Sequence, residues 1–153
     1  MYASKVLMEA LPNIHLLGTL ICVITAVYRK KALYPIYIFV FLTGLFGGFS
    51  PWWMPYLYVW TVLWGAVMLL PKKMPNRIAP FVYMAVCALH GFLFGVIYAP
   101  AQAILFHLDL KGMLAWIVSG LPFDLIHGMS NLFVGTLICP LIALLKKAEK
   151  LTK

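Results

Sequence analysis

The sequence predicts an all-α protein, a polytopic transmembrane helical bundle of about six helices in which the first helix is short or truncated. Of its 153 residues, 64% are hydrophobic and 10% are charged, whereas roughly a quarter of the residues in an average soluble domain are charged. Twelve Lys and Arg and four Asp and Glu side chains cannot cover a water-facing surface of this size. Lipid is therefore expected to be the solvent around most of the exterior.

The apolar residues form five segments, which are residues 14–28, 32–49, 55–70, 78–108 and 113–145. A membrane span needs about 20 mainly apolar residues. The fourth segment is too long for one straight span, so Pro100 is expected to end its helix and leave a short re-entrant or interfacial piece. Ser119 to Pro122 is expected to break the last segment, so that the final helix runs from Pro122 to about Leu145. About ten residues precede Pro12, too few for a span, which predicts the short first helix.

The basic residues predict the orientation of the chain. Ten of the twelve Lys and Arg lie in three clusters, at residues 29–31, 72–77 and 146–153. Alternating spans place all three clusters on one side of the membrane, and basic loops favour the cytoplasmic side. We therefore expect a multi-pass protein of the plasma (inner) membrane with a cytoplasmic C-terminus. The net charge of +8 then belongs to membrane loops, and no nucleic-acid partner is expected.

Asp124, His127 and Asn131 are spaced i, i+3 and i+7, so they share one face of the final helix. An ionisable group inside a span is costly and usually faces a cavity or a partner. Asp124 is also expected in the first turn, where the helix dipole stabilises an anion. The three residues are candidates for contact with a ligand. The alternative is an acid at a helix N-terminus together with hydrogen bonds between helices.

Aromatic residues form a second candidate feature. Trp53, Tyr56, Trp60 and Trp64 are three or four residues apart, which predicts an aromatic stripe on one helix. The stripe is either an interfacial belt of the kind that membrane proteins carry or a stacking wall for a flat ligand. We expect Trp53, Tyr56 and Trp60 to belong to the site and Trp64 to be packing.

The other polar candidates at membrane level are Asn13, His15, His90 and Gln102. The histidines lack the HxxxH or HxH spacing of a preformed metal site, and the cysteines lack CxxC spacing, so no metal and no other cofactor is expected. The chain contains no nucleophile elbow, P-loop, HExxH motif or carboxylate pair. An enzyme is therefore not expected.

Pairs of small residues at a spacing of four predict close helix packing. They are Gly44/Gly48, Gly91/Gly95 and Ala99/Ala103. In lipid, such spacing lets helix backbones approach each other. Packing within the bundle is the expected role, and a docking face for a partner subunit is the alternative.

Several of these segments resemble one family. They are Pro12-Asn13-Ile14-His15, the aromatic loop around Trp52 and Trp53, the stretch Gly120-Leu121-Pro122-Phe123-Asp124-Leu125-Ile126-His127-Gly128-Met129-Ser130-Asn131, Gly135, and Pro140-Leu141 before Lys146-Lys147. Together they are similar to the substrate-binding (S) components of energy-coupling-factor vitamin transporters. The resemblance covers nearly the whole chain and is most specific in the last helix.

The resemblance implies a single integral-membrane substrate-binding domain over residues 1–153, with both ends cytoplasmic and the ligand site near the outer face. It implies capture of a vitamin or a related small water-soluble micronutrient. It also implies partners, namely a transmembrane T component and two ATPase subunits, with membrane lipid around the bundle.

Two other classes of function stay open from the residues. The first is a self-sufficient secondary carrier or channel, in which Asp124 and His127 act as a proton relay. The second is an integral-membrane enzyme that acts on a lipid, with His90, His127 and Asp124 as acid and base groups. The lack of a carboxylate pair or metal-ligand spacing disfavours the enzyme.

Overall fold

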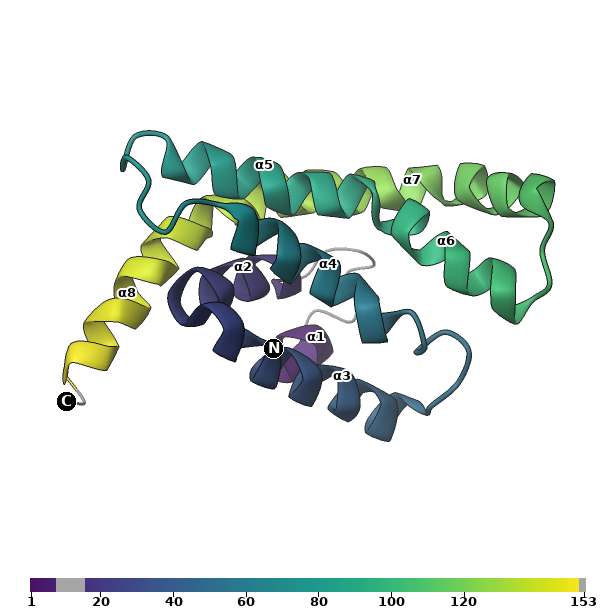
Figure 1. The fold of residues 1–153 in the computed structure, drawn as a ribbon, viewed down its shortest axis with the longest axis horizontal. Helices are drawn as coiled ribbons and strands as arrows, with labels where there is room; N and C mark the ends of the chain where they lie inside the picture. The colour runs from purple at the N-terminus through teal and green to yellow at the C-terminus, as the bar shows by residue number, and fades with distance from the viewer. Residues whose placement is uncertain (8–15, 152–153) are drawn as a thin grey trace.

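The structure is a computed structural model that describes residues 1–7 and 16–151. These residues are all-helical, with no strand among them (Figure 1). The α-helices are α1 (Tyr2–Leu7), α2 (Leu17–Tyr28), α3 (Leu33–Gly47), α4 (Tyr56–Leu69), α5 (Ala79–Phe92), α6 (Phe94–Leu105), α7 (Leu110–Val134) and α8 (Ile138–Leu151). Two 3-10 turns, η1 (Arg29–Ala32) and η2 (Gly135–Leu137), connect α2 to α3 and α7 to α8.

The helices form two layers (Figure 1). α5 and α7 run antiparallel along each other in one layer, and α2, α3 and α4 form the other. The contact between α5 and α7 is close because glycines meet there: a Cβ at Gly91 would lie 2.8 Å from the Cα of Gly128. The sequence predicted close packing at Gly91, and its role is within the bundle.

Two helical segments are long and apolar enough to cross a membrane, Ala79–Leu105 and Leu110–Leu151. α7 alone has 25 residues, which is about 37 Å of helix against a hydrocarbon core of about 30 Å. The exterior carries large apolar side chains, such as Phe81 at 71% and Phe133 at 68% exposure. Soluble monomers rarely expose apolar surface of this extent.

The helix breaks differ from those expected. Pro100 lies inside α6 and Pro122 lies inside α7, so neither proline ends its helix. The breaks fall at Leu93, between α5 and α6, and at η2, between α7 and α8. A proline inside a helix removes one hydrogen bond and costs about 3 kcal/mol. In α7 the residues beyond Pro122 bury a polar face against α5 and α6, and this packing outweighs the local cost.

The expected final span from Pro122 to about Leu145 is therefore not one straight helix. The chain bends at Gly135, where a Cβ would lie 3.2 Å from the Cα of Met84 on α5. After the bend, α8 leaves the line of α7 and packs against α2 (Figure 1).

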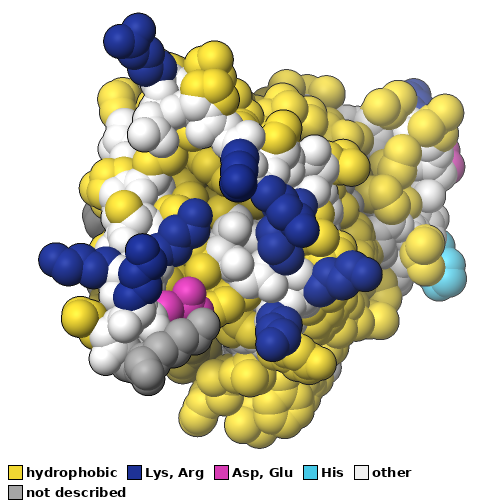
Figure 2. Space-filling view, turned by 60° about the vertical axis from the view of Figure 1, so that its left-hand side comes forward, with side chains coloured by type: hydrophobic (Ala, Val, Ile, Leu, Met, Phe, Trp, Pro, Cys, Tyr) yellow, Lys and Arg dark blue, Asp and Glu magenta, His cyan; other side chains and the backbone are white. Residues whose placement is uncertain are grey.

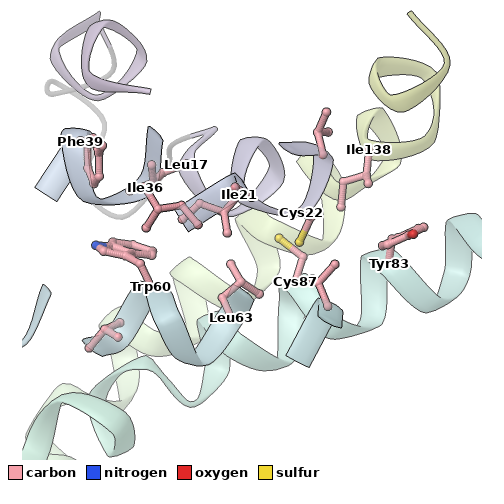
Figure 3. Packing of buried hydrophobic residues seen from close by; sticks show 14 of the residues in the cluster. Leu17, Ile21, Cys22, Ile36, Phe39, Trp60, Leu63, Tyr83, Cys87 and Ile138 are labelled. Carbon is pink, nitrogen blue, oxygen red and sulfur yellow. The ribbon is translucent and has the colours of Figure 1, made fainter. Parts of the chain in front are cut away.

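The buried apolar core lies between α2, α3, α4, α5 and α8 (Figure 3). Its largest fully buried side chain is Trp60, which packs edge-on against Phe39 with ring centroids 6.2 Å apart. Cys22 on α2 and Cys87 on α5 point toward each other in the same core. The core thus joins the two layers and fixes α4 beside α5.

Lys and Arg side chains gather at one end of the molecule (Figure 2). At this end Arg29 lies in the turn after α2, with a positive φ of 53°. Its guanidinium donates hydrogen bonds to the carbonyls of Val67 and Met68 in the last turn of α4. A cation at a helix C-terminus satisfies free carbonyls and interacts favourably with the helix dipole. Arg29 therefore fastens the α2–α3 turn to the end of α4.

Candidate functional site

The polar face predicted on the last long helix is buried. Asp124, His127 and Asn131 on α7 are 6%, 2% and 0% exposed. Residues on the opposite side of α7, such as Leu125 and Phe133, are exposed. The i, i+3, i+7 spacing therefore places the three polar side chains toward the other helices.

Asp124 occupies a different electrostatic position from the one expected. It lies in the middle of α7, not in the first turn. Its carboxylate instead accepts a hydrogen bond from the backbone N–H of Gly95, with Oδ1 and Oδ2 each 3.0 Å from the nitrogen. Gly95 is in the first turn of α6, where backbone N–H groups lack partners in the helix and the dipole favours an anion. The stabilising dipole is thus that of α6.

Phe94 is the centre of a cluster of aromatic rings, which we call the ring cluster (Tyr56, Trp60, His90, Phe94 and His127). The ring centroid of Phe94 lies 4.9 Å from that of His127, 5.7 Å from that of Trp60 and 6.0 Å from that of His90. Tyr56 adds an edge contact of 5.4 Å to Trp60. The cluster brings predicted site residues from α4, α5 and α7 together around one α6 residue.

His90 and Asn131 also bind backbone groups. Nε2 of His90 lies 3.0 Å from the carbonyl oxygen of Val59, and Nδ2 of Asn131 donates to the carbonyl of Cys87 over 3.1 Å. These bonds connect α5 to α4 and α7. Oδ1 of Asn131 is buried and has no hydrogen-bond partner among residues 1–7 and 16–151. An unsatisfied buried acceptor is costly, so this atom could accept from a further donor.

Only some residues of the predicted aromatic stripe lie together around the ring cluster. Trp53 precedes α4, and its Nε1 donates to the carbonyl of Val40 on α3 over 2.7 Å. Trp64 donates from Nε1 to the carbonyl of Arg29 at the basic end. Both indoles therefore hold helices together, and Tyr56 and Trp60 are the stripe residues that reach the ring cluster.

Three other predicted residues are not brought into the cluster. Gln102 on α6 is buried, at 7% exposure, and none of the described contacts joins its side chain to the cluster. Asn13 and His15 lie outside the described residues.

A pocket of about 240 Å³ lies between α6 and α7, and we call it the ring pocket. It is lined by Phe94, Gly95, Tyr98, Trp116, Gly120, Phe123 and Asp124. Its walls are aromatic, and the Asp124 carboxylate is its acidic group. The volume is at the small end of ligand sites, which typically measure about 300–1,000 Å³.

Sequence reasoning missed the aromatic residues of this pocket. Phe94 and Tyr98 are four residues apart and stack with centroids 5.6 Å apart, while Tyr98 stacks on Trp116 at 5.9 Å and 8°. The i, i+4 spacing of Phe94 and Tyr98 was a signal for a shared helix face. Trp116 offered no such signal, because its partner lies on another helix.

The rings of α4 and α6, together with Trp52 in the loop before α4, form a closed circuit of contacts. Trp52 packs on Tyr56 at 5.8 Å, and the contacts of Tyr56 with Trp60, Trp60 with Phe94 and Phe94 with Tyr98 continue it. The hydroxyl of Tyr98 then donates to the carbonyl of Trp52 and closes it. α4 and α6 are thus joined both in the buried ring cluster and at the half-exposed Trp52.

Within the described ranges, no group of three or more His, Cys, Asp or Glu side chains is placed to hold a metal ion. The chain matches no protein-family model, no curated protein and no solved structure.

Proposed function

We propose that this chain is the membrane-embedded substrate-capture subunit of an energy-coupling-factor importer, and that its substrate is a vitamin or a related small water-soluble micronutrient. The observation that carries the proposal is the ring pocket, in which stacked aromatic walls surround one anchored carboxylate. Such a site suits a flat ring that lies against an aromatic wall and is fixed by one polar contact. The resemblance of the Gly120–Asn131 stretch to S components supports the same function.

The pocket chemistry narrows the class of ligand. Tyr98 and Trp116 stack on each other and form one aromatic wall, and Asp124 offers an acceptor that is already held by Gly95. A carboxylate favours a ring that carries a positive charge or N–H donors, and aromatic faces attract cations. We therefore propose a nitrogen-containing heterocycle. His127 packs against Phe94 from behind this wall and sets the position of its ring.

The proposal places the chain as a multi-pass protein of the plasma membrane. The basic end of Figure 2 is then cytoplasmic, and the C-terminus is proposed to lie on the same side. The aromatic loop with Trp52 is then at the outer face. A transmembrane T component and two ATPase subunits are the proposed partners, because this chain has no nucleotide-binding motif of its own.

A ligand panel tests the capture function. The purified full-length chain is titrated with water-soluble vitamins and their precursors while tryptophan fluorescence and thermal unfolding are followed. One ring-containing compound is expected to change Trp fluorescence and to raise the unfolding temperature. The Asp124→Asn variant should bind it more weakly. If no compound in the panel binds, the capture function is wrong.

The buried Asp124 also favours a second candidate, a secondary carrier that couples substrate to protons. Proteoliposomes separate the two. A carrier takes up the panel ligand with this chain alone and a proton gradient. A capture subunit takes it up only when the T component and the ATPases are present with ATP.

A further inference from the structure

A second pocket lies at the opposite end of the molecule from the aromatic loop. It measures about 250 Å³ and is enclosed by α2, the segment before α5, α5 and α8. We call it the basic pocket, and its polar lining residues are Lys72, Asn76, Tyr83, Cys139 and Lys146. It shares no lining residue with the ring pocket.

The charged side chains that line the basic pocket are both cationic. Lys72 and Lys146 come from segments far apart in the sequence, and no carboxylate is among the described residues that line the pocket. Neither ammonium group makes a hydrogen bond or an ion pair with the described residues. An anion bound in this pocket would be attracted by both ammonium groups. Figure 2 shows that further Lys and Arg side chains surround this end.

A neutral donor is also present. Tyr83 is only 8% exposed, yet its side chain lines the pocket. Within the described part of the chain its hydroxyl has no hydrogen-bond partner. The hydroxyl therefore supplies the O–H that an oxyanion between the two lysines would accept.

The rest of the lining is apolar, with Ala79, Ile142 and Ala143 among it. A site with cationic groups beside an apolar wall matches the boundary between headgroups and acyl chains of a bilayer. Basic pockets between helices on the cytoplasmic side bind anionic headgroups. A soluble anion would use the lysines and the hydroxyl but not the apolar wall.

We propose that the basic pocket binds a phosphate group, namely the headgroup phosphate of an anionic phospholipid of the cytoplasmic leaflet. Lys72 and Lys146 neutralise the charge, and Tyr83 donates to a phosphate oxygen. The site goes beyond the proposed capture function and depends only on the membrane placement given with it. Each lysine is expected to contribute about a fivefold increase in affinity.

Cys139 is a built-in reporter, because it lines the pocket and is partly exposed. The full-length chain is reconstituted in vesicles of phosphatidylcholine alone or of phosphatidylcholine with phosphatidylglycerol. The rate at which N-ethylmaleimide, a membrane-permeant reagent, modifies Cys139 is followed by peptide mass spectrometry. Phosphatidylglycerol is expected to slow the modification severalfold. A third sample has phosphatidylcholine vesicles with inorganic phosphate on both sides.

Matched variants distinguish binding in the basic pocket from a general effect of positive surface charge. The double variant Lys72→Gln/Lys146→Gln should lose the protection, and Tyr83→Phe should weaken it. The control double variant Lys73→Gln/Lys147→Gln removes the same charge from neighbouring positions outside the pocket. This control should keep the protection of Cys139. If inorganic phosphate slows Cys139 modification and phosphatidylglycerol does not, the pocket is a phosphate site for a soluble ligand. Equal rates in all three samples, or equal loss in both double variants, would overturn the proposal.

This test is independent of the capture function. Cys139 reports on the basic pocket whether or not a vitamin is bound, since the ring pocket uses other residues. The Lys72→Gln/Lys146→Gln variant should bind the panel ligand with unchanged affinity. Failure of the vitamin panel would leave the labelling result interpretable.

Discussion

The backbone N–H of Gly95 and the carboxylate of Asp124 meet at the junction of α6 and α7, with both carboxylate oxygens 3.0 Å from the nitrogen. The contact is possible because residue 95 has no side chain: a Cβ there would lie 2.4 Å from Oδ2 of Asp124. The carboxylate therefore has a fixed position in the ring pocket before any ligand arrives. Pre-organised polar groups lower the cost of binding.

Substitution of Gly95 by alanine should displace the carboxylate. We expect Gly95→Ala to lower the free energy of unfolding by about 1–3 kcal/mol, as overpacking does, and to weaken ligand binding. Gly120→Ala is the control, because it lines the same pocket and a Cβ there meets no atom within 4 Å. This control should stabilise the helix by about 1 kcal/mol or less. Thermal unfolding in detergent measures both. Equal effects of the two variants would contradict the role of the Gly95 contact.

Trp60 and Trp64 lie one turn apart on α4 but should differ in ligand affinity. Trp60 contacts Phe94 in the ring cluster, whereas Trp64 donates to the carbonyl of Arg29. Trp60→Ala removes the support of a pocket wall. Aromatic pairs contribute about 0.5–1.5 kcal/mol beyond area burial, so affinity should fall by about tenfold at most. Fluorescence titration with the panel ligand should show a smaller loss for Trp64→Ala. Equal losses would assign both indoles to packing.

Asn131 connects α7 to α5 through its bond to the carbonyl of Cys87. Asn131→Ala should lower the free energy of unfolding by about 1 kcal/mol. If a ligand or a further donor also uses the unpartnered Oδ1, binding should fall by more than the stability loss explains. Ser119→Ala is the control: Ser119 also lies on α7, but it is exposed and bonds only within its own helix. Denaturation and ligand titration of the same preparations separate the two effects.

Arg29 should be the most important basic residue for stability. Its guanidinium bonds the last turn of α4, and hydrogen bonds to charged groups contribute about 1.5–3 kcal/mol. Arg29→Gln should therefore lower the unfolding temperature. Lys31→Gln removes one charge from the same exposed turn and should have little effect, because isolated surface charges contribute little. A similar loss in both variants would indicate a general charge effect instead.

The proposed topology predicts which residues lie on the same side of the membrane. Single cysteines introduced as Pro51→Cys and Lys73→Cys, in a chain with Cys139→Ala, should react with an impermeant maleimide from opposite sides of the membrane. Intact cells label the outer position, and inverted vesicles label the inner one. Labelling of both positions from one side would exclude the alternating spans.

The sequence predicted the helical class and the shared face of Asp124, His127 and Asn131, because composition and spacing along one helix determine both. It did not predict the helix breaks. Pro100 and Pro122 were expected to interrupt their helices because of the local cost of a proline. The packing of α7 against α5 and α6 instead decides whether a helix continues. Leu93 has no local breaking signal, and the contact of Gly95 with Asp124 forms two residues after this break.

For the site residues too, patterns along one helix could be predicted and contacts between helices could not. Trp53 was expected in the site because of its spacing, yet its indole reaches Val40 on α3. Phe94 was missed because an apolar residue within an apolar segment looks like any other. Its role comes from neighbours on three other helices, which spacing along one helix cannot reveal.

The closed circuit of Trp52, Tyr56, Trp60, Phe94 and Tyr98 has a consequence for how mutations combine. In an open chain of contacts, any single cut separates its two ends. In a loop, the first cut leaves every member connected by the other route, so only the second cut divides the circuit. The bond from the Tyr58 hydroxyl to the carbonyl of Ile97 lies outside the circuit and still joins α4 to α6. Substitutions at Tyr98 and Trp60 should thus be synergistic, with a coupling energy of about 0.5–3 kcal/mol for residues in one network. The circuit makes the ring contact between α4 and α6 tolerant of one loss and sensitive to two.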